Sequence, residues 1–328
     1  MGSQTFDKNV EAVFESVGVT RRDFMKFCGA MAAILGLPPV FASRIANAIE
    51  REIPFAGEKR PSVLWLNLQS CTGCTESFTR SDHPSIAEAV LTMISLDYHE
   101  TLLAASGKSA CQACESAMEE NRGKYILVVE GAVPVSDDGT FCTIAGKSGV
   151  EYLKNMSEKA AFVIALGTCA SYGGLPAAKP NPTAAQSVDE FVSPKTVVRI
   201  PGCPPIGDVL MATIVHFLFF GKLPALDSEN RPQFAYGKYI HEQCRRHYHF
   251  ENAEMVLGFN DDEYRGGYCL FPLGCKGAFT KNACSVMRWN MGTAWCVGSG
   301  HPCVGCSEKD FWDKFTPIYS LVEGRNPK

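Results

Sequence analysis

The stretch that decides the fold reads Ser62-Val-Leu-Trp-Leu-Asn-Leu-Gln-Ser-Cys-Thr-Gly-Cys74. An apolar run, Val63–Leu68, leads into two cysteines, Cys71 and Cys74, separated by two residues. Three more runs rich in β-branched residues follow before Pro205, with helical segments between them: Ile126–Glu130, Phe162–Leu166 and Thr196–Ile200. Continuous apolar strands that alternate with helices predict a parallel, doubly wound sheet with both faces covered.

Ligands of such sheets bind beyond the carboxyl ends of the strands, so the loops after the strands are expected to carry the chemistry. Those loops hold four cysteines: Cys71, Cys74, Cys169 and Cys203. Glycines beside them allow the backbone to approach a bound group closely. Four thiolates suit a cubane iron–sulfur cluster, and they suit a tetrahedral zinc ion equally well.

Composition narrows the classes of function. The chain has 328 residues, 46% of them hydrophobic, which is enough for one large or two modest domains. The 31 basic and 35 acidic residues are nearly balanced, and no basic run is interleaved with aromatic residues, so nucleic acid is a poor partner. The 15 cysteines are about twice the usual share and require disulfides, zinc or iron–sulfur clusters.

The N-terminus resembles a twin-arginine signal peptide spanning residues 1–48. Arg21 and Arg22 precede an apolar run, Phe27–Ala42, and Ala46-Asn-Ala48 has the small-x-small pattern of a cleavage site. An amphipathic helix with two solvated arginines is the alternative. Twin-arginine export carries proteins that are already folded and loaded with cofactors, which predicts a metal protein of the periplasm. The apolar runs, including Val209–Phe220, are too short to span a bilayer.

After about Leu223 the sequence loses sustained periodicity, and we expect metal sites to supply much of the folding free energy of this part. It holds seven cysteines and several histidines, too many ligands for one site. Their order suggests two sets: His241, Cys244, Cys269 and Cys275, then Cys284, Cys296, Cys303 and Cys306. His247 and His249 compete with His241 for the histidine position.

Six strings occur in one order along nearly the whole mature chain: Cys71-Thr-Gly-Cys-Thr-Glu-Ser, Gly-Thr-Cys169, Pro-Gly-Cys203-Pro-Pro, Ile-His241-Glu-Gln-Cys244, Leu-Gly-Cys275-Lys-Gly and Gly-His-Pro-Cys303-Val-Gly-Cys306. Together they closely resemble the small subunit of nickel–iron hydrogenases. The resemblance implies a flavodoxin-like domain, residues 49–222, followed by a cysteine-rich, mostly irregular and helical iron–sulfur domain, residues 223–328.

The resemblance also implies three clusters. Cys71, Cys74, Cys169 and Cys203 would bind a proximal 4Fe-4S cluster that faces the large subunit. His241, Cys244, Cys269 and Cys275 would bind a distal 4Fe-4S cluster near the surface, where a redox partner docks. Cys284, Cys303 and Cys306 would bind a medial cluster between the other two.

The sequence departs from the commonest family pattern at the medial site. Trp295 is followed by Cys296, where many relatives have proline and bind a 3Fe-4S cluster. A fourth thiolate predicts a medial 4Fe-4S cluster, as in the nickel–iron–selenium branch, with a lower potential because added negative charge disfavours the reduced state. A 3Fe-4S cluster, with Cys296 a spectator, is the alternative.

The implied reaction is the reversible oxidation of dihydrogen to two protons and two electrons at a nickel–iron site in a separate large subunit. This chain lacks the paired nickel-binding motifs of that subunit, so its implied role is to conduct electrons to a periplasmic cytochrome or a membrane quinone-linked acceptor. Two alternatives stay open: an iron–sulfur subunit of a quinone-reducing complex, and a non-catalytic protein held together by zinc or disulfides. Cys28, Cys111, Cys114 and Cys142 have no assigned role.

Overall fold

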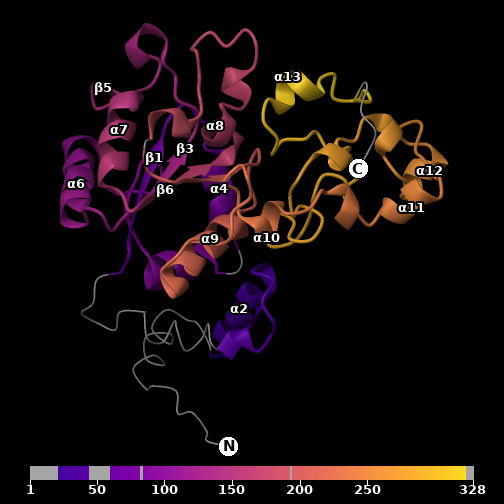
Figure 1. Ribbon diagram of the computed structural model, residues 1–328, viewed down its shortest axis with the longest axis horizontal. Helices are drawn as coiled ribbons and strands as arrows, with labels where there is room; N and C mark the ends of the chain where they lie inside the picture. Colours follow the sequence, from indigo (N-terminus) through magenta and orange to yellow (C-terminus); the bar gives the residue numbers. More distant parts are fainter. Residues whose placement is uncertain (1–20, 44–59, 82–83, 193, 323–328) are drawn as a thin grey trace, which may run out of the picture.

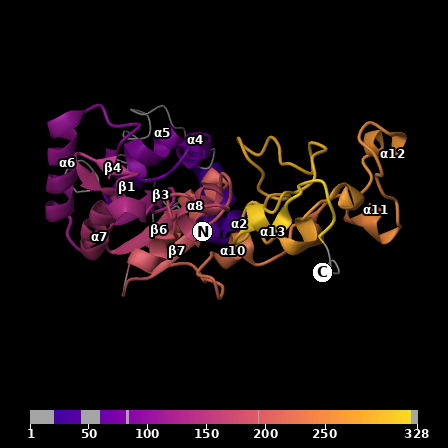
Figure 2. The ribbon, with the colours of Figure 1, turned by 90° about the horizontal axis from the view of Figure 1, so that it is seen from above.

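The computed structural model describes residues 21–43, 60–81, 84–192 and 194–322. A sheet region and a C-terminal region of loops and short helices lie side by side in Figures 1 and 2. The predicted order, a doubly wound sheet first and a cysteine-rich irregular part second, is confirmed.

The sheet has five parallel strands: β1 (Ser62–Asn67), β2 (Ser95–His99), β3 (Ile126–Glu130), β6 (Phe162–Leu166) and β7 (Val197–Ile200). Their spatial order is β2-β1-β3-β6-β7. Counted along the chain this is the order 2-1-3-4-5 of flavodoxin-like sheets, in which ligands bind near the point where the winding reverses. That point lies between β1 and β3, and the loop that holds Cys71 follows β1 directly.

Helices cover both faces of the sheet, as alternate strand residues require. Val63 and Val128 point to the face covered by α4 and α9, whereas Leu64 and Leu127 point to the face covered by α6 and α7. The helices of this region are α4 (Gly73–Thr79), α5 (Ile86–Glu88), α6 (Gly107–Glu120), α7 (Gly149–Lys159), α8 (Gly167–Tyr172) and α9 (Gly207–Phe220). A π-helix (Ala89–Met93), 3₁₀-helices (Ser136–Gly139, Leu175–Ala177, Val188–Phe191) and the hairpin β4 (Thr143–Ile144) to β5 (Lys147–Ser148) complete it.

Strand β2 was not predicted from the sequence. It is an edge strand of mixed composition, Ser-Leu-Asp-Tyr-His, and only Tyr98 and His99 are buried. Because an edge strand packs against one neighbour only, it does not need the continuous apolar run that marks the inner strands.

The C-terminal region has few regular elements. Its helices are α10 (Gln233–Tyr236), α11 (His247–Glu251), α12 (Asp262–Arg265) and α13 (Phe311–Phe315), with 3₁₀-helices at His241–Gln243, Phe271–Leu273 and Gly277–Phe279. One small core joins them, and Cys284 and Cys303 are part of it. Two ligand candidates, Cys284 and Cys303, thus occupy core positions that apolar side chains occupy in the sheet region.

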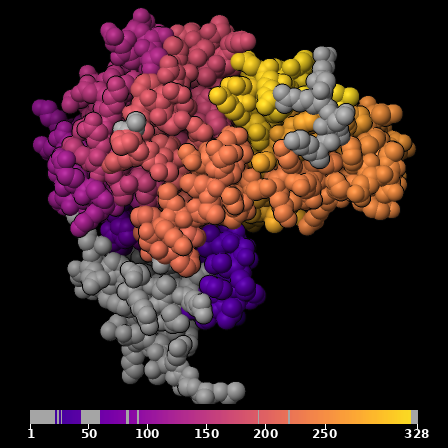
Figure 3. Space-filling model, in the orientation of Figure 1, coloured from indigo at the N-terminus to yellow at the C-terminus, as the bar shows by residue number. Residues whose placement is uncertain are grey.

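Helix α2 (Arg21–Ile34) contains the two arginines and the first half of the apolar run near the N-terminus. Cys28, Met31 and Ala32 are buried in the same core cluster as residues of α9. Figure 3 shows this indigo segment against neighbouring orange residues. Thr20 and the predicted cleavage site Ala46–Ala48 lie outside the described residues. Among the helices that the structure describes, none has both the length and the apolar character needed to cross a membrane.

Candidate metal centres

The first centre gathers the four cysteines that follow the strands. Cys71 and Cys74 lie at the start of α4, Cys169 lies in α8, and Cys203 follows β7. The pKa of Cys74 is raised well above its ordinary value, first by burial, next by the nearby charge of Glu130, and then by the other three thiols. The other three predicted thiols therefore lie near Cys74.

Glycines line this centre where a side chain would collide with sulfur. A Cβ on Gly167, whose φ is +84°, would lie 2.4 Å from Cys74 Sγ. A Cβ on Gly174 would lie 2.8 Å from Cys169 Sγ. These positions leave the cysteine sulfurs free of neighbouring side chains, as a group bound through sulfur requires.

A buried carboxylate supports the same centre. Glu130, the last residue of β3 and 1% exposed, accepts hydrogen bonds from the backbone N–H of Cys74 (3.1 Å) and from Trp65 Nε1 (3.2 Å). Thr75 Oγ1 also donates to Glu130, to Oε2 at 2.5 Å. Sequence reasoning missed Glu130, although its position at the carboxyl end of a central strand could have indicated it.

The second centre lies in the C-terminal region. A cavity there is lined by His241, Cys244, Cys269 and Cys275, the whole predicted set. Burial, followed by His247, lowers the pKa of His241 and favours the neutral imidazole that binds metals. The rings of His241 and His247 lie 4.6 Å apart, but His247 does not line the cavity.

The third centre joins Cys284, Cys296, Cys303 and Cys306. Burial raises the pKa of Cys284 well above its ordinary value, and the other three thiols add to the effect in the order Cys306, Cys303, Cys296. Cys284 and Cys303 are buried, whereas Cys296 is exposed in the isolated chain. The other three predicted thiols therefore lie near Cys284.

Neighbouring centres are in direct contact. The backbone N–H of Cys303, in the third centre, donates to Cys275 Sγ, in the second, at 3.4 Å. Burial raises the pKa of Cys306 to about 12, and a backbone hydrogen bond from Cys203, in the first centre, opposes that rise. The third centre therefore lies between the other two.

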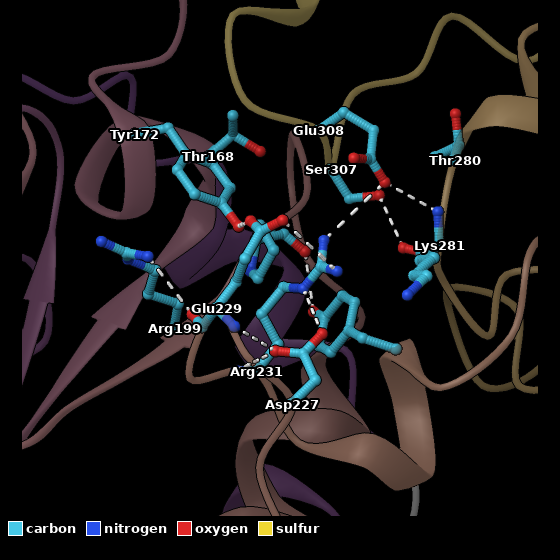
Figure 4. A network of polar contacts seen from close by, with 12 residues as sticks. Thr168, Tyr172, Arg199, Asp227, Glu229, Arg231, Thr280, Lys281, Ser307 and Glu308 are labelled. Atoms are coloured by element: carbon cyan, nitrogen blue, oxygen red, sulfur yellow. Dashed lines mark hydrogen bonds and ion pairs between the residues drawn. The ribbon is translucent and has the colours of Figure 1, made fainter.

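A polar network ties the sheet region to the C-terminal region beside these contacts (Figure 4). The Arg231 guanidinium lies 2.8 Å from Asp227 and 3.8 Å from Glu308. Glu308 accepts the backbone N–H of Lys281 at 2.7 Å, and the Tyr172 hydroxyl of α8 donates to Glu229 at 2.5 Å. Arg231 is only 3% exposed, so the network is a buried joint between the two regions.

Backbone N–H groups donate to sulfur in the C-terminal centres. Cys244 Sγ accepts the N–H of Arg246, and Cys303 Sγ accepts the N–H of Gly305, each at 3.4 Å. Sulfurs that accept backbone hydrogen bonds fit the ligands of an iron–sulfur cluster. Within residues 21–43, 60–81, 84–192 and 194–322, no three histidine, cysteine or acidic side chains are close enough together to hold one metal ion.

Comparison with known proteins decides the family. The chain is 48% identical over 302 residues to the uptake hydrogenase small subunit of Azotobacter vinelandii, an alignment that covers 92% of this chain and 83% of the relative. The chain belongs to the small subunits of nickel–iron hydrogenases. It is thus the electron-transferring part of an oxidoreductase that acts on hydrogen together with a large subunit, as the sequence resemblance indicated.

Other matches to this hydrogenase small subunit agree. The family model for the C-terminal part of the NiFe/NiFeSe hydrogenase small subunit matches residues 236–319, and the model described as NADH ubiquinone oxidoreductase, 20 Kd subunit matches residues 71–217. The quinone-reactive Ni/Fe-hydrogenase small chain of Wolinella succinogenes is 43% identical over 315 residues, covering 95% of this chain and 87% of the relative.

Solved structures of nickel–iron–selenium hydrogenases have the same fold. The enzyme of Desulfomicrobium baculatum matches with a TM-score of 0.76 at 35% identity, over 80% of this chain and 100% of that one. The enzyme of Desulfovibrio vulgaris Hildenborough matches with a TM-score of 0.75 at 38% identity, over 81% and 99%. Of the two family models, the one described as NADH ubiquinone oxidoreductase, 20 Kd subunit matches within the sheet region, whereas the hydrogenase model matches the C-terminal region.

The remaining cysteines lie outside the three centres. Cys111 and Cys114 lie on α6, and burial raises the pKa of Cys114 to about 12, which keeps its thiol protonated. Cys142 is partly buried beside Gly149, and Cys28 is buried in α2.

Proposed function

We propose that this subunit holds three iron–sulfur clusters in a row and relays electrons between the nickel–iron site of the large subunit and an external partner. The supporting observation is that twelve ligand candidates converge as three sets of four, with the third set in contact with both others. In this proposal residues 1–48 are the export signal, 49–222 carry the proximal site, and 223–328 carry the medial and distal sites.

At the proximal site, Cys71, Cys74, Cys169 and Cys203 would hold a 4Fe-4S cluster. Cys71 and Cys203 are exposed in the isolated chain. An exposed cluster would react with solvent and oxygen, so this face is where the large subunit is expected to cover the chain. When bound, the clusters supply one-electron transfer, and the hydrogen bonds and burial around each thiolate set the potential.

At the medial site, we propose a 4Fe-4S cluster held by Cys284, Cys296, Cys303 and Cys306. Structures similar in fold include nickel–iron–selenium enzymes, and Cys296 lies with the other three thiols. Cys296→Pro is expected to convert the site to a 3Fe-4S form, seen as a new electron paramagnetic resonance signal on oxidation. An unchanged spectrum would remove Cys296 from the ligand set.

At the distal site, His241, Cys244, Cys269 and Cys275 would hold a 4Fe-4S cluster from which electrons leave. His241 is partly exposed, so this site is within reach of a docked partner. A periplasmic cytochrome or a membrane quinone-linked module would be the acceptor, in line with the quinone-reactive name of the Wolinella relative. The twin-arginine pattern supports a periplasmic location for the assembled enzyme.

The first test is anaerobic analysis of iron and acid-labile sulfide in the native complex, with electron paramagnetic resonance of its oxidised and reduced forms. We expect about twelve irons, four for each of three cubanes, and no 3Fe-4S signal in the oxidised protein. About eleven irons with that signal would refute the medial assignment alone. Zinc without sulfide would overturn the whole proposal.

A further inference from the structure

Two contacts join neighbouring centres. At the medial–distal junction, the backbone N–H of Cys303 donates to Cys275 Sγ at 3.4 Å. At the proximal–medial junction, the hydroxyl of Thr168, the residue before Cys169, donates to the carbonyl of Cys306.

Thr168 holds the proximal–medial junction together. Its backbone N–H donates to the Gly202 carbonyl at 3.0 Å, and its hydroxyl accepts the Gly202 N–H at 2.9 Å. The same hydroxyl donates its proton to the carbonyl of Cys306. One side chain therefore links the loop before Cys203 to the main chain of Cys306, a residue 138 positions away in sequence.

Burial makes this link rigid and its loss costly. Thr168 is 1% exposed, so water cannot replace its hydroxyl. Without the hydroxyl, the Gly202 N–H would lose its hydrogen-bond partner, and a buried unpaired donor drives a local rearrangement. Rearrangement there would move Cys203 relative to Cys306.

We propose that Thr168 is a positioning residue for electron transfer, which holds the loop before Cys203 against the main chain of Cys306 and so fixes the spacing between the proximal and medial sites. This inference rests on the cluster assignment proposed above. One electron crosses at a time from a reduced proximal site to an oxidised medial site. No bond forms or breaks, and the amide proton stays on its nitrogen.

The test compares three variants in the complete hydrogenase complex. Thr168→Val keeps the shape and removes the hydroxyl, and Thr168→Ser keeps the hydroxyl. Thr213→Val is the matched control, because Thr213 is equally buried but its hydroxyl bonds only within α9, to the Val209 carbonyl. For each preparation, the rate of hydrogen-driven dye reduction is divided by the rate at which the large subunit exchanges hydrogen gas with deuterium. The iron content and the magnetic coupling between the proximal and medial sites are also measured.

For Thr168→Val at full iron content, we expect the dye-to-exchange ratio to fall about tenfold, the usual scale for residues that support metal ligands. The resonance splitting between the proximal and medial sites should weaken as well. Thr168→Ser should restore both readouts, and Thr213→Val should change neither.

An unchanged ratio and splitting in Thr168→Val with full iron would overturn the inference. If that variant loses iron, Thr168→Ala is measured in its place, and loss of iron there too would make the hydroxyl a folding requirement and also overturn the positioning role. Absence of iron and sulfide from the unmodified complex would be a failure of the proposed function, which is a separate result.

Discussion

The sheet region and the C-terminal region hold their metal-ligand candidates in opposite ways. In the sheet region, two extensive apolar clusters cover the faces of β1, β3 and β6, and the cysteines project from loops that these strands already fix. In the C-terminal region, one small core includes Cys284 and Cys303 among its own members. We therefore expect the first region to be stable through apolar burial and the second to depend on the binding of metal by its ligand candidates.

Removal of the clusters should therefore separate the two regions, and we expect this to be the largest effect. Metal ligation contributes on the order of 10 kcal/mol in small structural metal sites. After chelation under oxidising conditions, the amides of residues 240–310 should lose protection in hydrogen–deuterium exchange, while β3 and β6 keep theirs. Equal loss in both regions would contradict the comparison.

The same contrast explains what the sequence could predict. The inner strands are visible as apolar runs, so the sheet and the loops after it were predictable to within a residue or two. The edge strand β2 was not, because three of its five residues are only partly buried and it has no continuous apolar run. Glu130 and Thr168 were missed because their roles depend on contacts 56 and 138 positions away, which no local pattern encodes. In the C-terminal region, only the cysteine spacing carried information.

A second prediction concerns the joint between the regions. Arg231→Met leaves Asp227 and Glu308 partly buried without their cation, and the loss of one partner from a buried pair costs about 3–5 kcal/mol. We expect a lower midpoint in thermal unfolding of the loaded complex. Arg265→Met is the control, because the Arg265–Asp262 pair is largely exposed and should contribute nothing measurable.

If Arg231→Met unfolded at the same temperature as the wild type, the polar network would not contribute to joining the two regions. If hydrogen–deuterium exchange of the C-terminal amides became faster while that of β3 did not change, the polar network would stabilise the C-terminal region.

A third prediction uses the pH dependence of the sheet region. His99 is 1% exposed, and burial lowers its pKa from the ordinary 6.5 to about 4. Its Nδ1 accepts the backbone N–H of Thr101 at 3.1 Å, so the ring is neutral with its proton on Nε2, toward Thr75. Protonation of Nδ1 would place two N–H donors against each other and remove the hydrogen bond from Thr101.

Because the folded pKa lies below the unfolded one, the stabilisation is complete above pH 6.5 and declines as the pH falls toward 4, by about 3 kcal/mol over the full range. His99→Gln should flatten the unfolding free energy between pH 6.5 and 5. His216→Gln provides the comparison, because burial also lowers the pKa of this partly buried histidine on α9; we expect it to change the slope less than His99→Gln does. An unaltered slope in His99→Gln would assign the acid sensitivity to other groups, such as the C-terminal ligands.

The smallest effect is expected at the distal centre. His241→Ala removes the one imidazole from the cavity shared with Cys244, Cys269 and Cys275. We expect hydrogen-driven dye reduction to fall about 10–100-fold. The hydrogen–deuterium exchange activity of the large subunit should be nearly unchanged, since the sheet region, which we propose faces that subunit, holds its ligand candidates independently of the C-terminal region.

His247→Ala is the matched control, because its ring packs against His241 without lining the cavity. If His241→Ala lost dye reduction and hydrogen–deuterium exchange activity equally, the distal centre would be needed for the structure of the whole subunit, including the proximal site. That outcome would break the contrast between the regions, because it would show that the sheet cannot hold its own centre once the C-terminal ligands are disturbed.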